Sequence, residues 1–205
     1  TTEWPRVALA WSIRFLYRVG FVIGWTIIVA MFVSKYGILS LPYLLAANAF
    51  FTILGSVIFS TFIYKLSRQQ GMIVTTLLSV LTLFAAIKLG AIYEGAFFIL
   101  IVVTEAVFLM QFKMLLDAFT EDLFDPLSSE RTFPIIEASE TLGGIIAGLL
   151  VFSFANSVDT FNFIYLWIVL LLLIVPFILI YSYFSRKVPL IKEHPHTLQK
   201  QLGMF

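Results

Sequence analysis

The 205-residue chain contains no cysteine, and only 12% of its residues are charged. The missing cysteine excludes disulfides, thiolate metal sites and cysteine nucleophiles. A soluble domain carries about twice this fraction of charged residues, so the composition argues against a water-soluble fold. The formal net charge of +1 gives no reason to expect a nucleic-acid partner.

Catalytic and cofactor-binding motifs are missing as well. Both histidines, His194 and His196, lie in the polar C-terminal tail, outside every long apolar run. A haem with a histidine ligand is therefore not expected within the apolar part. The sequence also lacks an H-E-x-x-H helix, a Ser–His–Asp set and a phosphate-binding loop. We predict that the chain is not an enzyme and that it binds no cofactor and no metal.

The chain is rich in long apolar runs, with 60% hydrophobic residues and a mean hydropathy of +1.00. A membrane-spanning helix needs about 20 mostly apolar residues. The apolar runs do not alternate as barrel strands do, and helices satisfy their own backbone in lipid. We therefore predict an all-α, polytopic integral membrane protein embedded in a lipid bilayer. The six expected spans are 8–33, 41–64, 72–89, 93–112, 134–154 and 161–183.

The spans divide as three plus three about the turn at Gly90, and we expect a 3+3 bundle. Residues 1–187 form the predicted six-helix transmembrane domain, and 188–205 form a polar cytoplasmic tail or linker. The fourth helix is expected to continue beyond the bilayer. Lys113 and Asp117 are four residues apart on this extension, so they can form an ion pair.

The loop before the fifth span contains the predicted end of one helix and the start of the next. We expect a break near Asp125 and Pro126, and a restart at Ser128 or Thr132. Pro134 then falls in the first turn, where its missing N–H costs nothing.

The basic residues predict an orientation. Of the 13 lysines and arginines, 11 lie on the N-terminal side of the predicted spans, and two, Lys35 and Lys88, lie on the other side. The positive-inside rule then places both termini in the cytoplasm. An even number of spans agrees with this, and we expect a multi-pass protein of a bacterial or organellar inner membrane.

Charged residues inside the apolar runs are the most informative feature of the sequence. A charge at a helix centre costs about 2.5–3.5 kcal/mol on insertion scales, so it usually faces a partner, a cavity or a pathway. Arg14 and Arg18 share one face of the first span, and Glu94 and Glu105 share one stripe of the fourth. These four are the candidates for a cavity lining or a buried ion pair.

Arg18 and Glu105 lie at about the same depth, which predicts an ion pair between the first and fourth spans. An alternative also fits the pattern. In it, both arginines reach toward the headgroups and Glu105 is protonated beside a hydroxyl group.

Small residues predict two close helix contacts. Thr141, Gly144 and Gly148 line one face of the fifth span, and a Gly-x-x-x-Gly spacing lets a neighbouring helix approach closely. Gly20 and Gly24 in the first span are a second candidate of the same kind.

The entry to the fifth span carries Arg131, Glu137 and Glu140. The two glutamates are expected in the first turns of the helix, where a carboxylate is stabilised by the helix dipole. An ion-binding or substrate-binding role for them is the alternative.

These features together resemble one half of a major-facilitator-type transporter. The stretch RTFPIIEASETLGGIIAG at 131–148, with the acidic segment 117–125 before it, resembles the entry to helix five in relatives of the bacterial and plastid ATP/ADP carriers. The loop KLSRQQG at 65–71 departs from that fold, since it lacks the usual aspartate. The resemblance implies that Arg14, Arg18 and Glu105 face a central cavity.

Two functions follow as hypotheses. The first is alternating-access transport of a small anionic, nucleotide- or phosphate-like solute, as half of a carrier completed by a second six-helix half or by a homodimer. The second is a non-transporting scaffold or regulatory subunit within a larger complex of other membrane subunits. No charged ring or filter-like segment supports an ion channel.

Overall fold

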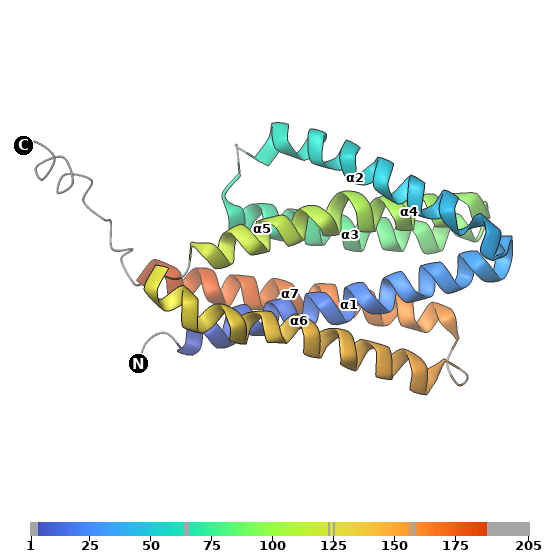
Figure 1. Ribbon diagram of the computed structural model, residues 1–205. Coiled ribbons are helices and arrows are strands. Elements are labelled where there is room, and N and C mark those ends of the chain that lie inside the picture. The colour runs from blue at the N-terminus through green and yellow to red at the C-terminus, as the bar shows by residue number, and fades with distance from the viewer. Residues whose placement is uncertain are drawn as a thin grey trace, which may run out of the picture.

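The computed structural model describes residues 4–63, 66–122, 124, 126–155, 157 and 159–187, and every regular element in these ranges is helical (Figure 1). The elements in chain order are α1 (Trp4–Tyr36), η1 (Ile38–Ser40), α2 (Leu41–Ile63), α3 (Arg68–Gly90), α4 (Glu94–Val103), η2 (Thr104–Leu109), α5 (Met110–Glu121), α6 (Pro126–Phe154) and α7 (Thr160–Lys187). The tail at 188–205 lies outside the described residues.

Six helices of the described chain are long and apolar enough to cross a membrane. The fourth of them is the continuous rod α4–η2–α5, which extends to Glu121, as expected for a helix that continues beyond the bilayer. For the described residues, the prediction of an all-α fold with six helices long and apolar enough to span a membrane is therefore confirmed. Short connections join the helices, and Gly37, with a φ of 81°, makes the turn after α1.

Local sequence explains two of the helix starts. Ser67 caps α3, because its side chain accepts a hydrogen bond from the Gln70 N–H while the Gln70 side chain accepts one from the Ser67 N–H. Helix α6 begins at Pro126, so the predicted restart at Ser128 or Thr132 is wrong. Proline is favourable in the first turn of a helix, and Pro126 occupies that turn of α6. Pro134 consequently lies inside α6.

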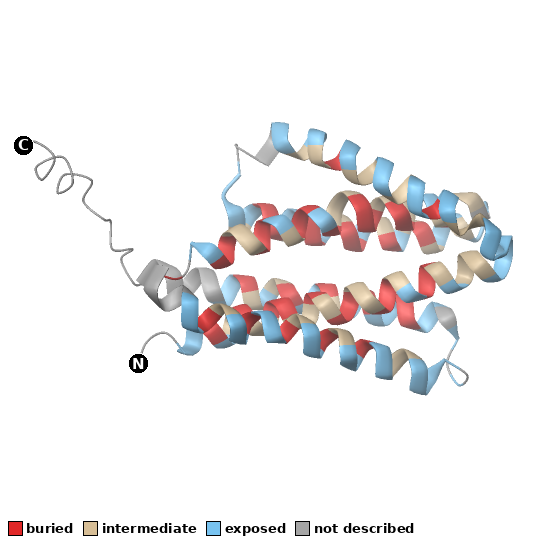
Figure 2. Ribbon diagram, viewed as in Figure 1, coloured by how far each residue is buried: buried red, intermediate tan, exposed pale blue. Residues whose placement is uncertain are grey.

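The helices form two groups that meet along α3 and α7. Helix α1 packs mainly against α6 and α7, while α3 packs against α4, η2 and α5, and α2 packs against η2. Burial follows the same pattern, since α2 and α6 are mostly exposed and the helices between them are more buried (Figure 2). The first span thus groups with the last two, and these contacts do not confirm the 3+3 division.

Close packing in the α1 group depends on glycine. The Trp167 side chain of α7 is fully buried. A Cβ atom at Gly24 would lie 2.6 Å from three ring atoms of Trp167, and one at Gly20 would lie 3.0 Å from its Cδ1. The glycine strip of α1 therefore makes room for the largest side chain in the core.

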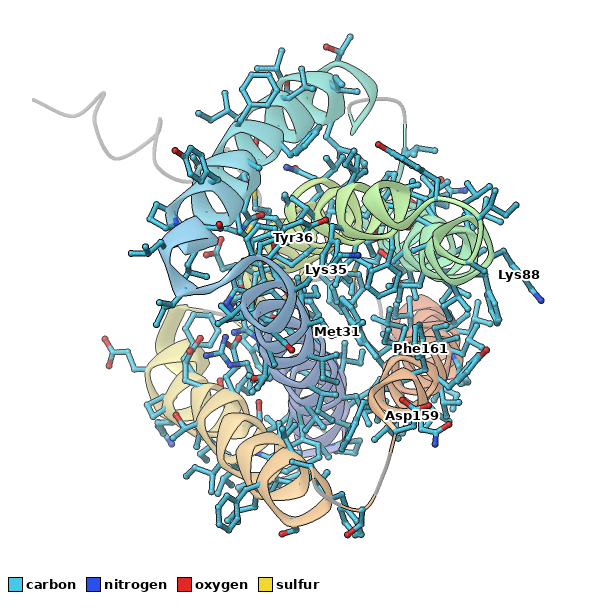
Figure 3. All side chains as sticks on the ribbon, turned by 90° about the vertical axis from the view of Figure 1, so that its right-hand side faces the viewer. Met31, Lys35, Tyr36, Lys88, Asp159 and Phe161 are labelled. Atoms are coloured by element: carbon cyan, nitrogen blue, oxygen red, sulfur yellow. The ribbon has the colours of Figure 1, made fainter. Side chains whose placement is uncertain are left out.

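The bundle has two distinguishable ends. Helix α1 begins and helix α7 ends at the same end, at the left of Figure 1, which we call the N-terminal end. Lys35 and Lys88 lie at the opposite end, which faces the viewer in Figure 3. The assignment of these two lysines to the side opposite the other basic residues thus agrees with their position in the structure.

Candidate functional site

Arg14 lies at the centre of a group of ion pairs. Its side chain is only 5% exposed, and its Nη2 lies 2.7 Å from Asp117 Oδ1. Its Nη1 lies 2.9 Å from Glu137 Oε1 and 2.8 Å from Glu140 Oε1. These contacts join α1 to both α5 and α6.

Lys113 completes this group from α5. Its Nζ lies 3.1 Å from Asp117 Oδ1 and 2.9 Å from Glu140 Oε1. The pair of Lys113 and Asp117 predicted from their spacing is therefore present. We call Arg14, Lys113, Asp117, Glu137 and Glu140 the ion-pair network. Its two cations and three carboxylates give it a formal charge of −1.

A cavity of about 280 Å³ lies beside the ion-pair network. Among its lining residues, Thr120 and Glu121 come from α5, and Phe133 and Ile136 come from α6. Within the described residues, no group of three or more histidine or carboxylate side chains could hold a metal ion. The ion pairs of the network join α1, α5 and α6.

Glu137 and Glu140 do not occupy the first turns of their helix. Because α6 begins at Pro126, both lie well inside it. Their carboxylates are bound by Arg14 and Lys113 instead of the helix terminus. Arg131, in the same helix, is exposed.

Arg18 faces α6 rather than α4. A Cβ atom at Gly143 would lie 3.1 Å from Arg18 Cβ, and one at Gly144 would lie 3.9 Å from Arg18 Nε. The guanidinium carbon lies 5.8 Å from the centre of the Phe21 ring, and Nε is buried without a hydrogen-bond partner. Glycine at 143 thus lets the arginine stem lie across the backbone of α6.

Glu105 lies in the π-helical segment η2 and is 6% exposed. The Asn48 side chain of α2 neighbours its carboxyl group, and Glu105 Oε2 is buried without a hydrogen-bond partner. The described residues contain no ion pair between Glu105 and Arg18, in contrast to the expectation from depth. Equal depth means only that two residues lie at the same level in the membrane, not that they face each other. Here Glu105 faces α2, whereas Arg18 faces α6. Glu94 begins α4, and its side chain lies outside the described ones.

A further polar link joins α2 to α5, where Gln111 Nε2 donates to Ser56 Oγ at 3.0 Å. These polar side chains are carried by α1, α2, η2, α5 and α6, and of these helices α1, α2 and α6 lie on the side of the bundle opposite α3 and α7 (Figure 3). We call this set of side chains the polar face. Its members are Arg14, Arg18, Asn48, Ser56, Glu105, Gln111, Lys113, Asp117, Glu137 and Glu140.

Two of the three residues of the predicted α6 strip are not covered by another helix of the described chain. Thr141 and Gly148 are exposed, and a Cβ atom at Gly148 would meet nothing within 4 Å. The buried strip of α6 is instead formed by Gly143 and Ala147. Gly144 lies at the boundary between these two strips.

A larger cavity of about 710 Å³ lies at the opposite end of the bundle, between α1, α3, α4 and α7. Its walls are mostly apolar and include Met31, Phe97, Phe161 and Tyr165, with Lys35 as a charged residue of α1 (Figure 3). Its size is within the usual range for small-molecule sites, about 300–1,000 Å³.

Sequence reasoning missed Asn48, Ser56 and Gln111 as members of the polar face. Each is a single polar residue within an apolar run, and that is the signal that could have indicated it. The pairing of Asp117 with Arg14 had no such signal, because the two residues are far apart in the chain.

No family model matches this chain, and comparisons with curated proteins and with solved structures found no similar protein. The resemblance to a carrier half therefore stays a prediction.

Proposed function

We propose that the chain is one six-helix half of a membrane carrier for a small anionic solute, nucleotide- or phosphate-like. The observation that supports this most strongly is the polar face. Polar and ionisable side chains inside a membrane usually face a pathway, a cavity or one another. Polar side chains from several helices are what a solute path needs, and a second six-helix half, or a second copy of the chain, would complete that path.

The two ends of the bundle support alternating access. The ion-pair network ties α1, α5 and α6 together at the N-terminal end. The cavity of about 710 Å³ lies at the opposite end. In this proposal the network is the closed gate, and its ion pairs separate when the carrier opens toward that side. The N-terminal end faces the cytoplasm, as the basic residues predict, and the membrane is a bacterial or organellar inner membrane. The topology is that of a 3+3 bundle.

Arg18 is the residue we assign to the anion. Arg14 is already bound by three carboxylates, so it has little capacity left for a substrate. Arg18 is bound by none within the described residues, and its guanidinium lies on the polar face. A guanidinium matches the geometry of a phosphate group well.

The second candidate is a scaffold or regulatory membrane subunit. The burial and neutralisation of Arg14 favour it, because such a network can simply hold helices together. The two functions predict different assemblies, and native mass spectrometry in mild detergent can distinguish these by their mass. A homodimer or a chain with a second six-helix half supports the carrier, and a fixed complex with unrelated subunits supports the scaffold.

Uptake by proteoliposomes tests the carrier directly, with labelled ATP and inorganic phosphate as probes. We expect uptake by the natural protein, strong loss in Arg18→Gln, and no change in Arg131→Gln, which removes an exposed arginine. Absence of uptake in all three, together with unrelated subunits in the native complex, would overturn the carrier.

A further inference from the structure

Glu105 and Asn48 leave two buried oxygen atoms without a hydrogen-bond donor. These atoms are Glu105 Oε2 and Asn48 Oδ1, and neither has a partner. The Asn48 side chain neighbours the Glu105 carboxyl group, and an amide can donate to a carboxylate only through its N–H₂ group. Glu105 Oε2 and Asn48 Oδ1 are thus two buried acceptors that no described donor satisfies.

No side chain of the described residues donates to these two acceptors. Gln111 already donates to Ser56. Tyr17 of α1, which interacts electrostatically with both Glu105 and Arg18, donates its hydroxyl to the Leu109 carbonyl oxygen at 3.2 Å.

The helices packed on the other sides of η2 add no charge next to Glu105. From α3, Thr82 is hydrogen-bonded to Thr104 of η2 at 2.7 Å. At the end of α4, the buried residues Ile101 and Val102 are apolar. An ionised carboxylate buried here would lack both a cation and a full set of donors, which is costly.

We propose that Glu105 and Asn48 form a proton-binding site within the polar face. The Glu105 carboxylate takes a proton from a hydronium ion and releases water, and the resulting Oε2–H donates to Asn48 Oδ1. Both acceptors are then satisfied by one proton, and the acid and amide are joined by two hydrogen bonds. On release, the proton returns to water that reaches the polar face.

The backbone at this position is also unusual. Glu105 lies in η2, a π-helical segment of six residues between α4 and α5. Such segments are rare and occur frequently at functional sites. Glu105 is the second residue of this segment, and the segment packs against α2, which carries Asn48. Use of this site to couple proton movement to solute movement rests on the carrier function proposed above.

Infrared difference spectroscopy on the full chain in lipid nanodiscs tests the site without any transport. The readout is the C=O band of a protonated carboxyl group as the pH is raised from acidic to alkaline. We expect one such band that disappears on deprotonation, is lost in Glu105→Gln and is kept in Glu121→Gln, a matched change at an exposed acid in the same rod. An identical band in the natural protein and Glu105→Gln would overturn the proposal.

A second variant keeps the proposal testable if Glu105→Gln does not fold. In Asn48→Leu we expect the band to persist at higher wavenumber, because the Glu105 carbonyl loses its donor. An unmoved band would contradict the acid–amide pair. Removal of the band by Na⁺ at constant pH and ionic strength would show a sodium site and would also overturn the proposal. If the band behaves as expected but no uptake occurs, the proton site stands and the carrier function fails.

Discussion

Glu140 Oε1 of α6 lies 2.8 Å from Arg14 Nη1 of α1, and the two side chains are 15% and 5% exposed. This contact joins two helices that are separated by most of the chain. The same oxygen also binds Lys113, so Glu140 connects three helices through one carboxylate.

This relationship predicts a stability loss in Glu140→Gln. Breaking an isolated buried pair from one side costs about 3–5 kcal/mol, and the loss here should be smaller because Arg14 keeps Asp117 and Glu137 while Lys113 keeps Asp117. Thermal unfolding in nanodiscs should show a clearly lower midpoint for Glu140→Gln, while Glu130→Gln, at an exposed position of the same helix, should unfold like the natural protein. Equal midpoints for the two variants would show that the network contributes nothing to stability.

A contrasting prediction concerns Arg68 and Asp122, which pair between α3 and the end of α5 on the exposed surface. Exposed pairs contribute about 0–1 kcal/mol. Asp122→Asn should therefore change the unfolding midpoint less than Glu140→Gln does. A loss as large as that of Glu140→Gln would mean that this pair is shielded from water in the membrane-bound protein.

Gly24 provides a packing test. In Gly24→Ala the new methyl group meets the Trp167 ring, and overpacking of this kind costs about 1–3 kcal/mol. Gly148→Ala is the matched control, because it meets nothing within 4 Å and should be neutral or slightly stabilising. The smaller side chain in Trp167→Leu should relieve part of the cost when combined with Gly24→Ala. Independent, additive effects in the double variant would contradict the contact.

The absence of cysteine makes orientation measurable with single introduced cysteines. Leu39 is 89% exposed at the opposite end, and Glu121 is exposed at the N-terminal end. In intact cells, a membrane-impermeant maleimide should label Leu39→Cys directly and Glu121→Cys only after permeabilisation. The reverse pattern would place the N-terminal end outside and would overturn the cytoplasmic assignment.

The sequence predicted the helices well, because apolar length and the energetic cost of unpaired backbone in lipid leave few alternatives. It also identified Arg14, Arg18 and Glu105 as unusual. It could not assign their partners. Depth along a helix follows from counting residues, but direction around the axis depends on packing and on the π-helical segment η2, which no sequence pattern predicted.

Helix boundaries were the other source of error. The start of α6 at Pro126 moved Glu137 and Glu140 from the first turns into the helix, and so changed their role. A proline allows a helix to begin but does not require it, so Pro126 and Pro134 were equally suitable starts by local rules.

The proposed carrier requires that water reaches the polar face, and cysteine labelling measures this access most directly. Thr141 is exposed and lies one turn after Glu137 on α6, whereas Leu172 is exposed on α7, away from the polar face. In proteoliposomes, Thr141→Cys should react with a water-soluble maleimide and be protected by ATP or phosphate, while Leu172→Cys should not react. Equal lack of reaction at both positions would show that the face lies against lipid and would contradict the account.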